Sequence, residues 1–81
     1  MTEFPSMRAR ELLAVLMREP LNYEIVRLRG SHRRLKAPGR PSITFAFHDR
    51  QTIAPGVVRQ VLCRQVGLVE ADARELLLST G

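Results

Sequence analysis

With 81 residues the chain has room for one domain and one modest hydrophobic core, which excludes a two-domain enzyme. A composition of 44% hydrophobic and 26% charged residues is typical of a folded globular domain, and no apolar run is long enough to cross a membrane. The formal net charge of +5 favours an anionic partner, most commonly nucleic acid. We therefore expect a single basic domain over residues 1–81, located in the cytoplasm because its first residues lack the apolar stretch of a signal peptide.

The N-terminal part of the chain predicts a helix over residues 7–18. Its apolar residues recur at helical spacing, from Ala9 to Met17. Ser6 precedes this segment as the expected N-cap, and Pro20 lies just past its end.

Three strands are predicted next. Residues 23–29 mix polar residues with β-branched ones, and Gly30-Ser31 is a two-residue turn of the Gly-first kind that closes a hairpin with a second strand at residues 32–36. Turn-forming residues at 37–41 lead into a third strand at 42–47, where apolar and small residues alternate.

Two helices complete the predicted fold. After a polar loop at residues 49–54, Pro55 opens a helix that Gly67 ends, and a last amphipathic segment spans about residues 70–79. The order α-β-β-β-α-α predicts an α+β fold in which helices pack on one face of a three-stranded antiparallel sheet.

The hairpin turn and the strand period of two decide which side chains share a face of this sheet. The predicted cross-strand pairs are Arg29 with His32, Arg27 with Arg34, and Ile25 with Lys36. One face is then basic and carries Arg27, Arg29, His32, Arg34 and Lys36, with Tyr23 and Ile25 exposed beside them. The other face is expected under the helices and carries Val26, Leu28, Leu35, Ile43, Phe45 and Phe47, with Arg33 as its one charged residue. Like charges directly opposite each other destabilise a hairpin, so the pair Arg27–Arg34 indicates that the basic face binds a polyanion.

Two histidines fall on the predicted basic face. His32 and His48 come out as diagonal neighbours at the ~7 to 8 Å typical of such pairs. Two imidazoles that flank a phosphodiester can cleave RNA without a metal, because one removes the proton of the ribose 2′-hydroxyl and the other protonates the leaving 5′-oxygen. Neighbouring arginines can stabilise the added negative charge of the transition state. From the spacing alone, a solvated strand histidine remains the alternative for each.

The stretch from Tyr23 to Leu68 resembles the HicA family of toxin ribonucleases. The matching elements are Tyr23, Arg27-Leu28-Arg29-Gly30-Ser31-His32, Phe47-His48, Gly56-Val57-Val58-Arg59-Gln60-Val61-Leu62 and Gly67-Leu68, and Arg10-Glu11-Leu12-Leu13 fits the family's first helix. Each element is short, but their order and spacing together are specific. The chain departs from the family pattern at Arg33, where many members carry a second histidine, at Phe47, which replaces a proline, and at Asn22, which replaces a glycine.

The resemblance implies a fold similar to a double-stranded RNA-binding domain and an activity of mRNA cleavage with His32 as the catalytic residue. It also implies a partner, a HicB-type antitoxin that covers the active face. In this interpretation Gly30 permits the turn that presents His32, and Ser31 orients phosphate. The RNA backbone is held by Arg27, Arg29, Arg34 and Lys36.

Two other interpretations stay open from the sequence. The first is a non-catalytic RNA-binding module of the same fold, and the second is a DNA-binding or protein-binding domain in which Tyr23 and Ile25 seat the partner. Metal catalysis is disfavoured because Asp49 is the only carboxylate near His48 in the sequence, and we expect no cofactor. The single cysteine, Cys63, excludes an internal disulfide and is expected to fill the core.

Overall fold

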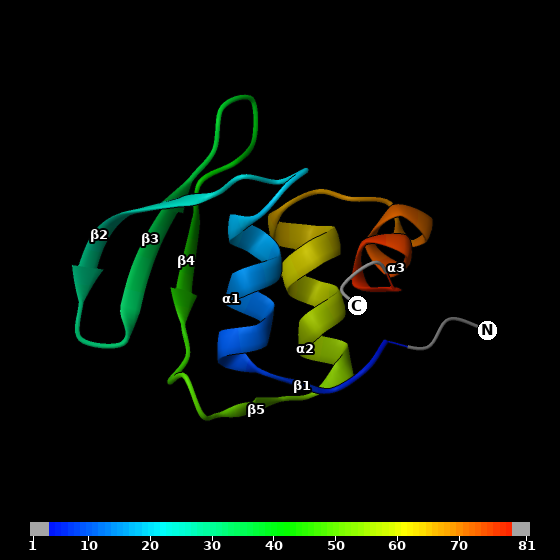
Figure 1. The fold of residues 1–81 in the computed structure, drawn as a ribbon, viewed down its shortest axis with the longest axis horizontal. Helices are drawn as coiled ribbons and strands as arrows, with labels where there is room; N and C mark the ends of the chain where they lie inside the picture. The colour runs from blue at the N-terminus through cyan, green and yellow to red at the C-terminus, as the bar shows by residue number, and fades with distance from the viewer. Residues whose placement is uncertain (1–3, 79–81) are drawn as a thin grey trace.

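The middle of the chain forms a three-stranded antiparallel sheet in the order β2-β3-β4, and helices from the two ends of the chain pack beside it (Figure 1). The computed structural model of the protein describes residues 4–78. The elements in chain order are β1 (Met7–Arg8), α1 (Ala9–Met17), β2 (Glu24–Arg29), β3 (His32–Lys36), β4 (Ile43–Ala46), β5 (Thr52–Ile53), α2 (Pro55–Arg59), η1 (Gln60–Gln65) and α3 (Glu70–Leu78). This is the predicted α+β class, and the three central strands lie within one residue of their predicted positions.

One face of the sheet is buried against the helices, because apolar and polar residues alternate along β3 and β4. In β4, Ile43 and Phe45 are buried whereas Thr44 is exposed, and in β3 the buried residue is Leu35. The helices complete this core with Leu12, Val15 and Leu16 from α1, Val58, Val61 and Leu62 from α2 and η1, and Ala73 and Leu76 from α3. The opposite face of the sheet is therefore left open to solvent.

A β-bulge at Val26 changes the register of the first hairpin. The pairs Arg29–His32 and Arg27–Arg34 form as predicted, but beyond the bulge Ile25 pairs with Leu35, and Glu24 pairs with Lys36. The predicted pair of Ile25 with Lys36 is wrong. One inserted residue moves every side chain that precedes it to the other face of a strand.

The bulge places Tyr23 in the core, whereas a regular strand predicts that it is exposed on the basic face. Tyr23 is 1% exposed, and its hydroxyl donates a hydrogen bond of 2.7 Å to the carbonyl oxygen of Pro41. Burial raises the pKa of this phenol, and the nearby Arg40 opposes that shift. Tyr23 therefore anchors the loop between β3 and β4 and is not available to seat a partner.

The outer strand β2 is exposed along its whole length, and in Figure 1 it lies farthest from the helices. Val26 and Leu28 were expected under the helices but are 53% and 64% exposed. Val26 is the extra residue of the bulge. Leu28 does face the helix side, opposite Arg33, but it lies on the strand that the helical layer does not reach.

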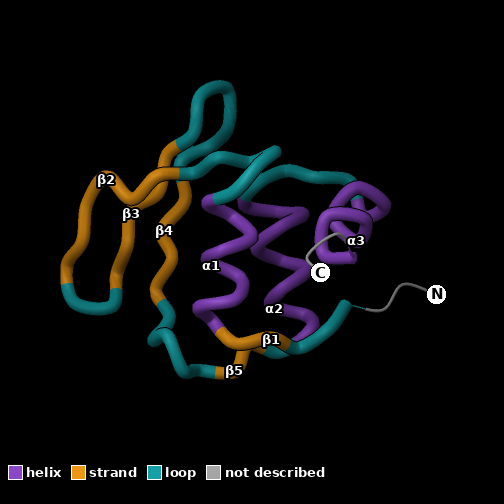
Figure 2. Tube along the Cα trace, viewed as in Figure 1, coloured by secondary structure: helices purple, strands orange, loops and turns teal. Residues whose placement is uncertain are grey.

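The start of α1 differs from the prediction. Met7 and Arg8 belong to a short antiparallel pair with Thr52 and Ile53, so part of the predicted loop at residues 49–54 is a strand and α1 begins at Ala9. Figure 2 shows this pair of strands beneath the N-terminal ends of α1 and α2. The predicted N-cap, Ser6, lies outside the helix.

Carbonyl groups of the loop after β4 take the place of the predicted cap. The amides of Ala9 and Arg10 donate to the carbonyl oxygens of Gln51 and Asp49 at 2.8 and 3.2 Å. These bonds satisfy donors that an α-helix leaves unpaired in its first turn.

The C-terminal helices follow the prediction closely. Pro55 opens α2, which continues as the π-helical segment η1, and Gly67 ends this helix with φ +94°. An ion pair between Arg59 and Glu70 joins α2 to α3. The predicted end of the last helix, at residue 79, lies outside the described residues. Within residues 4–78 no helix is both long enough and apolar enough to span a membrane.

Candidate active site on the open face of the sheet

The β2–β3 hairpin presents His32 at the edge of the open face. Gly30 takes φ +60°, a conformation that residues with a Cβ atom rarely adopt, and the chain reverses tightly enough to pair Arg29 with His32. His32 is exposed and pairs on its other side with Ala46 of β4. The predicted turn and the predicted pairing of His32 are both confirmed.

Basic side chains continue along the open face from His32. Arg34 lies between Arg27 of β2 and Thr44 of β4, and its guanidinium donates to the Thr44 hydroxyl at 3.1 Å. Arg27, Arg34 and Lys36 line one shallow hollow together with Val26. The structure thus brings together the predicted substrate-binding residues Arg27, Arg29, Gly30, Ser31, Arg34 and Lys36 on one hairpin.

The positive charge on this face is concentrated toward the His32 end. Lys36 pairs with Glu24, whose carboxylate offsets part of its charge, whereas from residue 25 to residue 48 the sequence contains no acidic residue. Two adjacent cross-strand pairs, Arg29 with His32 and Arg27 with Arg34, therefore form the part of the face that is best suited to an anionic ligand.

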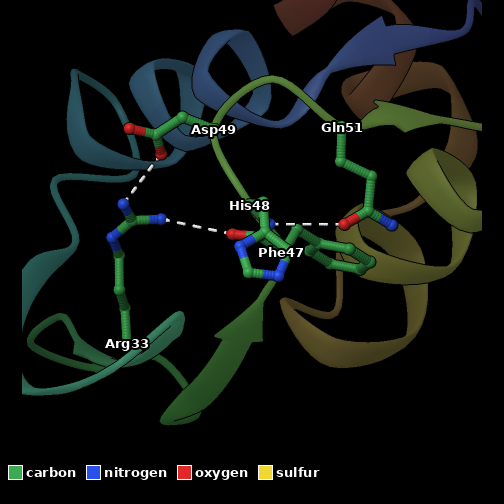
Figure 3. Close-up of polar contacts among 5 residues, drawn as sticks. All are labelled: Arg33, Phe47, His48, Asp49 and Gln51. Carbon is green, nitrogen blue, oxygen red and sulfur yellow. Dashed lines mark hydrogen bonds and ion pairs between the residues drawn. The ribbon is translucent and has the colours of Figure 1, made fainter.

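Arg33 lies on the other face of β3, as its position in the strand predicts. Its side chain is 17% exposed, and its Nη2 lies 2.7 Å from Oδ1 of Asp49 (Figure 3). Its Nη1 also donates to the carbonyl oxygen of Phe47 at 3.5 Å. Arg33 is therefore engaged by the loop that follows β4 and does not belong to the basic face.

His48 lies in that loop, two residues beyond the end of β4. Its side chain is exposed, its backbone amide donates to Oε1 of Gln51 at 3.3 Å, and its carbonyl accepts from the Gln51 amide at 2.9 Å. Because β4 ends at Ala46, the strand ladder does not extend to His48, and the diagonal arrangement of the two histidines stays a prediction.

Two residues around His48 were not recognised as site residues from the sequence. Asp49 and Gln51 both contact the segment that carries His48, and Figure 3 shows them on opposite sides of it. A signal for Asp49 was present, since in an extended chain residues 45, 47 and 49 lie on the face of Arg33. Gln51 carried no comparable signal.

The remaining reactive side chain lies away from the open face. Cys63 is half-buried and packs against the core, as predicted, and burial raises the pKa of its thiol, while Arg59 opposes that shift. Among the described residues no three His, Cys, Asp or Glu side chains lie together in a way that could hold a metal ion.

The fold and the site define a small α+β protein whose open sheet face joins an exposed histidine to a cluster of arginines, the kind of surface that binds nucleic acid. The family model for the HicA toxin of bacterial toxin–antitoxin systems matches residues 9–68, from the start of α1 through Leu68. The chain belongs to this family, whose members are in general ribonucleases that have an RNA substrate and a cognate antitoxin. No curated protein and no solved structure matches the chain, so the similarity to a double-stranded RNA-binding domain stays a prediction.

Proposed function

We propose that this protein is the toxin of a type II toxin–antitoxin system and acts in the cytoplasm as a metal-independent endoribonuclease that cleaves mRNA. The observation that carries the proposal is the position of His32. It stands exposed at the end of a tight hairpin, directly opposite Arg29 and next to the pair formed by Arg27 and Arg34. Membership of the HicA family supports the same activity.

The proposed chemistry is proton transfer at a phosphodiester. His32 takes the proton of the ribose 2′-hydroxyl, and the 2′-oxygen attacks phosphorus. The bond to the 5′-oxygen then breaks, and that oxygen leaves with a proton from His48. The products are a 2′,3′-cyclic phosphate and a 5′-hydroxyl end.

The surrounding residues hold the backbone and stabilise the transition state. Arg29 and Arg27 from β2 and Arg34 from β3 are the arginines nearest His32 in the strand pairing, and we assign them to the negative charge that the phosphorane gains, because preorganised donors of this kind lower the barrier. Lys36 extends the basic face away from His32. Gly30 and Ser31 form the turn next to His32, and we assign the backbone of Gly30 and the hydroxyl of Ser31 to the scissile phosphate.

The experiment that tests this function compares the wild type with His32→Ala on a labelled single-stranded RNA, with EDTA present. We expect the substitution to lower the cleavage rate by ~10² to 10⁴-fold while RNA binding is retained, because a general base contributes that much. Arg64→Gln, on η1 in the helical layer, is the control for changes remote from the site. A wild type that binds RNA without cutting it would favour the non-catalytic RNA-binding module, and undiminished cleavage by His32→Ala would show that His32 is not the catalyst.

The proposed partner is a HicB-type antitoxin that covers the open face. A surface with this density of arginines favours a partner that presents carboxylates to it, and such complementarity speeds association and selects the partner. We expect the antitoxin and RNA to compete for the toxin, and a complex that still cleaves RNA at the wild-type rate would contradict this mode of inhibition.

A further inference from the structure

The segment that carries His48 is tied to the rest of the protein on both sides of that residue. On one side Arg33 binds the carbonyl oxygen of Phe47 and the carboxylate of Asp49. On the other side Gln51 bonds both the amide and the carbonyl of His48 itself. The first turn of α1 adds two further bonds, to the carbonyl oxygens of Asp49 and Gln51.

The imidazole of His48 is left free by this arrangement. It is exposed, and within residues 4–78 neither a hydrogen bond nor an ion pair involves its ring. The backbone is fixed at each neighbouring residue, while the imidazole ring makes no hydrogen bond to the described residues. A preorganised functional group requires this arrangement.

The contacts of the neighbouring residues also indicate where His48 points. Phe45 and Phe47 stack edge to face on the core side, with ring centroids 5.0 Å apart, and Arg33 holds Asp49 from that same side. Successive side chains along β4 alternate between faces, and Phe47 continues its core side. His48, the next residue, is thereby directed toward the open face, before the chain turns at Asp49 and Arg50.

We propose that Arg33 and Asp49 are positioning residues, whose ion pair holds His48 at the edge of the open face as the second proton-transfer group. This inference rests on the proposed ribonuclease function. It assigns Arg33 a role other than binding phosphate, because its guanidinium is mostly buried and already paired with a carboxylate. The ion pair acts through the geometry of the loop.

The kinetic test uses Asp49→Asn, Arg33→Met and their combination, each made in the wild type and in a His48→Ala background. We expect each single change to lower kcat by ~10 to 100-fold with KM unchanged, because small displacements of a catalytic group have effects of that size. The combination should lower kcat no more than one change alone does. In the His48→Ala background none of these changes should lower kcat further. Asp49→Glu should restore part of the rate.

A matched control is available in an ion pair that lies away from the sheet. Arg59 binds Glu70 in the helical layer, so Arg59→Met removes an arginine from an ion pair without touching the loop of His48. We expect this variant to cleave at the wild-type rate. If Asp49→Asn and Arg33→Met reduce cleavage equally in the presence and absence of His48, they act on the structure as a whole, and the proposal is overturned.

A second measurement does not depend on cleavage. In NMR spectra of the free protein, the ring signals of His48 should shift and broaden in Asp49→Asn and in Arg33→Met, while those of His32 stay in place and Arg59→Met changes neither. Unmoved His48 signals would overturn the proposal. If the wild type does not cleave RNA, the proposed function fails together with the catalytic role of His48, and the NMR result alone decides whether the ion pair positions the ring.

Discussion

The pair of arginines that face each other across the hairpin should weaken the free protein and strengthen its complex with RNA. Arg27 and Arg34 are directly opposite, on strands that expose both side chains. Opposed like charges destabilise a strand pair by roughly 0.2 to 1 kcal/mol. Arg27→Gln removes this repulsion, so the free energy of unfolding should rise by about that amount. In a domain of this size such a gain corresponds to a melting temperature higher by up to about 4 to 8 °C.

The same substitution should reduce the salt dependence of RNA binding. If Arg27 neutralises one phosphate, its loss lowers the slope of log affinity against log salt by about 0.7 for a single strand. The assays are urea unfolding at low salt and fluorescence anisotropy of a labelled RNA over a series of KCl concentrations. His32→Ala can be carried as a background to prevent cleavage during the titration.

Arg64→Gln is the matched control, because it removes the same charge from an exposed residue of η1 and leaves the sheet unchanged. We expect no gain in stability and no change of slope in this variant. Equal slopes for the two variants would mean that RNA affinity depends on the net charge of the protein and not on the arginines of the open face. A destabilised Arg27→Gln protein would refute the repulsion argument itself.

Two further predictions concern the hairpin turn and the loop between β3 and β4. Gly30→Ala should lower the free energy of unfolding by ~1 to 2 kcal/mol in urea titrations, because the φ of +60° disfavours alanine. The effect comes from the backbone, since no atom lies within 4 Å of the new Cβ. An unchanged unfolding midpoint would contradict the turn geometry. Tyr23→Phe should lower the free energy of unfolding by ~0.5 to 1.5 kcal/mol, because it removes the part-buried hydrogen bond to the Pro41 carbonyl. Since burial raises the pKa of Tyr23, the unfolded chain loses its phenolic proton first, and stability should fall as the pH rises above about 10. Tyr23 is the only tyrosine, so Tyr23→Phe should lack this component of the alkaline loss, and identical alkaline profiles for the two proteins would contradict it.

The hairpin and the position of His32 beside its turn could be predicted because their determinants are local. Gly30-Ser31 specifies the turn, and the turn specifies the partner of His32. The bulge at Val26 was missed, although the sequence carries a sign of it. In residues 21–29 the odd-numbered positions are apolar up to Ile25, whereas Arg27 and Arg29 are basic. A regular strand cannot accommodate this change of phase without turning one set of side chains to the wrong face.

Features that depend on contacts between distant parts of the chain could not be predicted from the local sequence. The Arg8 amide bonds the Glu11 side chain nearby in the sequence, but the amides of Ala9 and Arg10 find their acceptors in the loop after β4, which no local pattern around Ser6 indicates. The ion pair of Arg33 with Asp49 likewise depends on the path of the chain beyond the last strand of the sheet.

The shared bonds between α1 and the His48 loop have a consequence for the synthesis of the protein. The amides of Ala9 and Arg10 leave the ribosome early, but their acceptors at Asp49 and Gln51 are translated only after the entire sheet. A nascent chain that has completed only the hairpin already contains His32, yet its first helix still lacks those acceptors. The start of α1 and the loop of His48 can therefore adopt their final arrangement only after translation has passed Gln51.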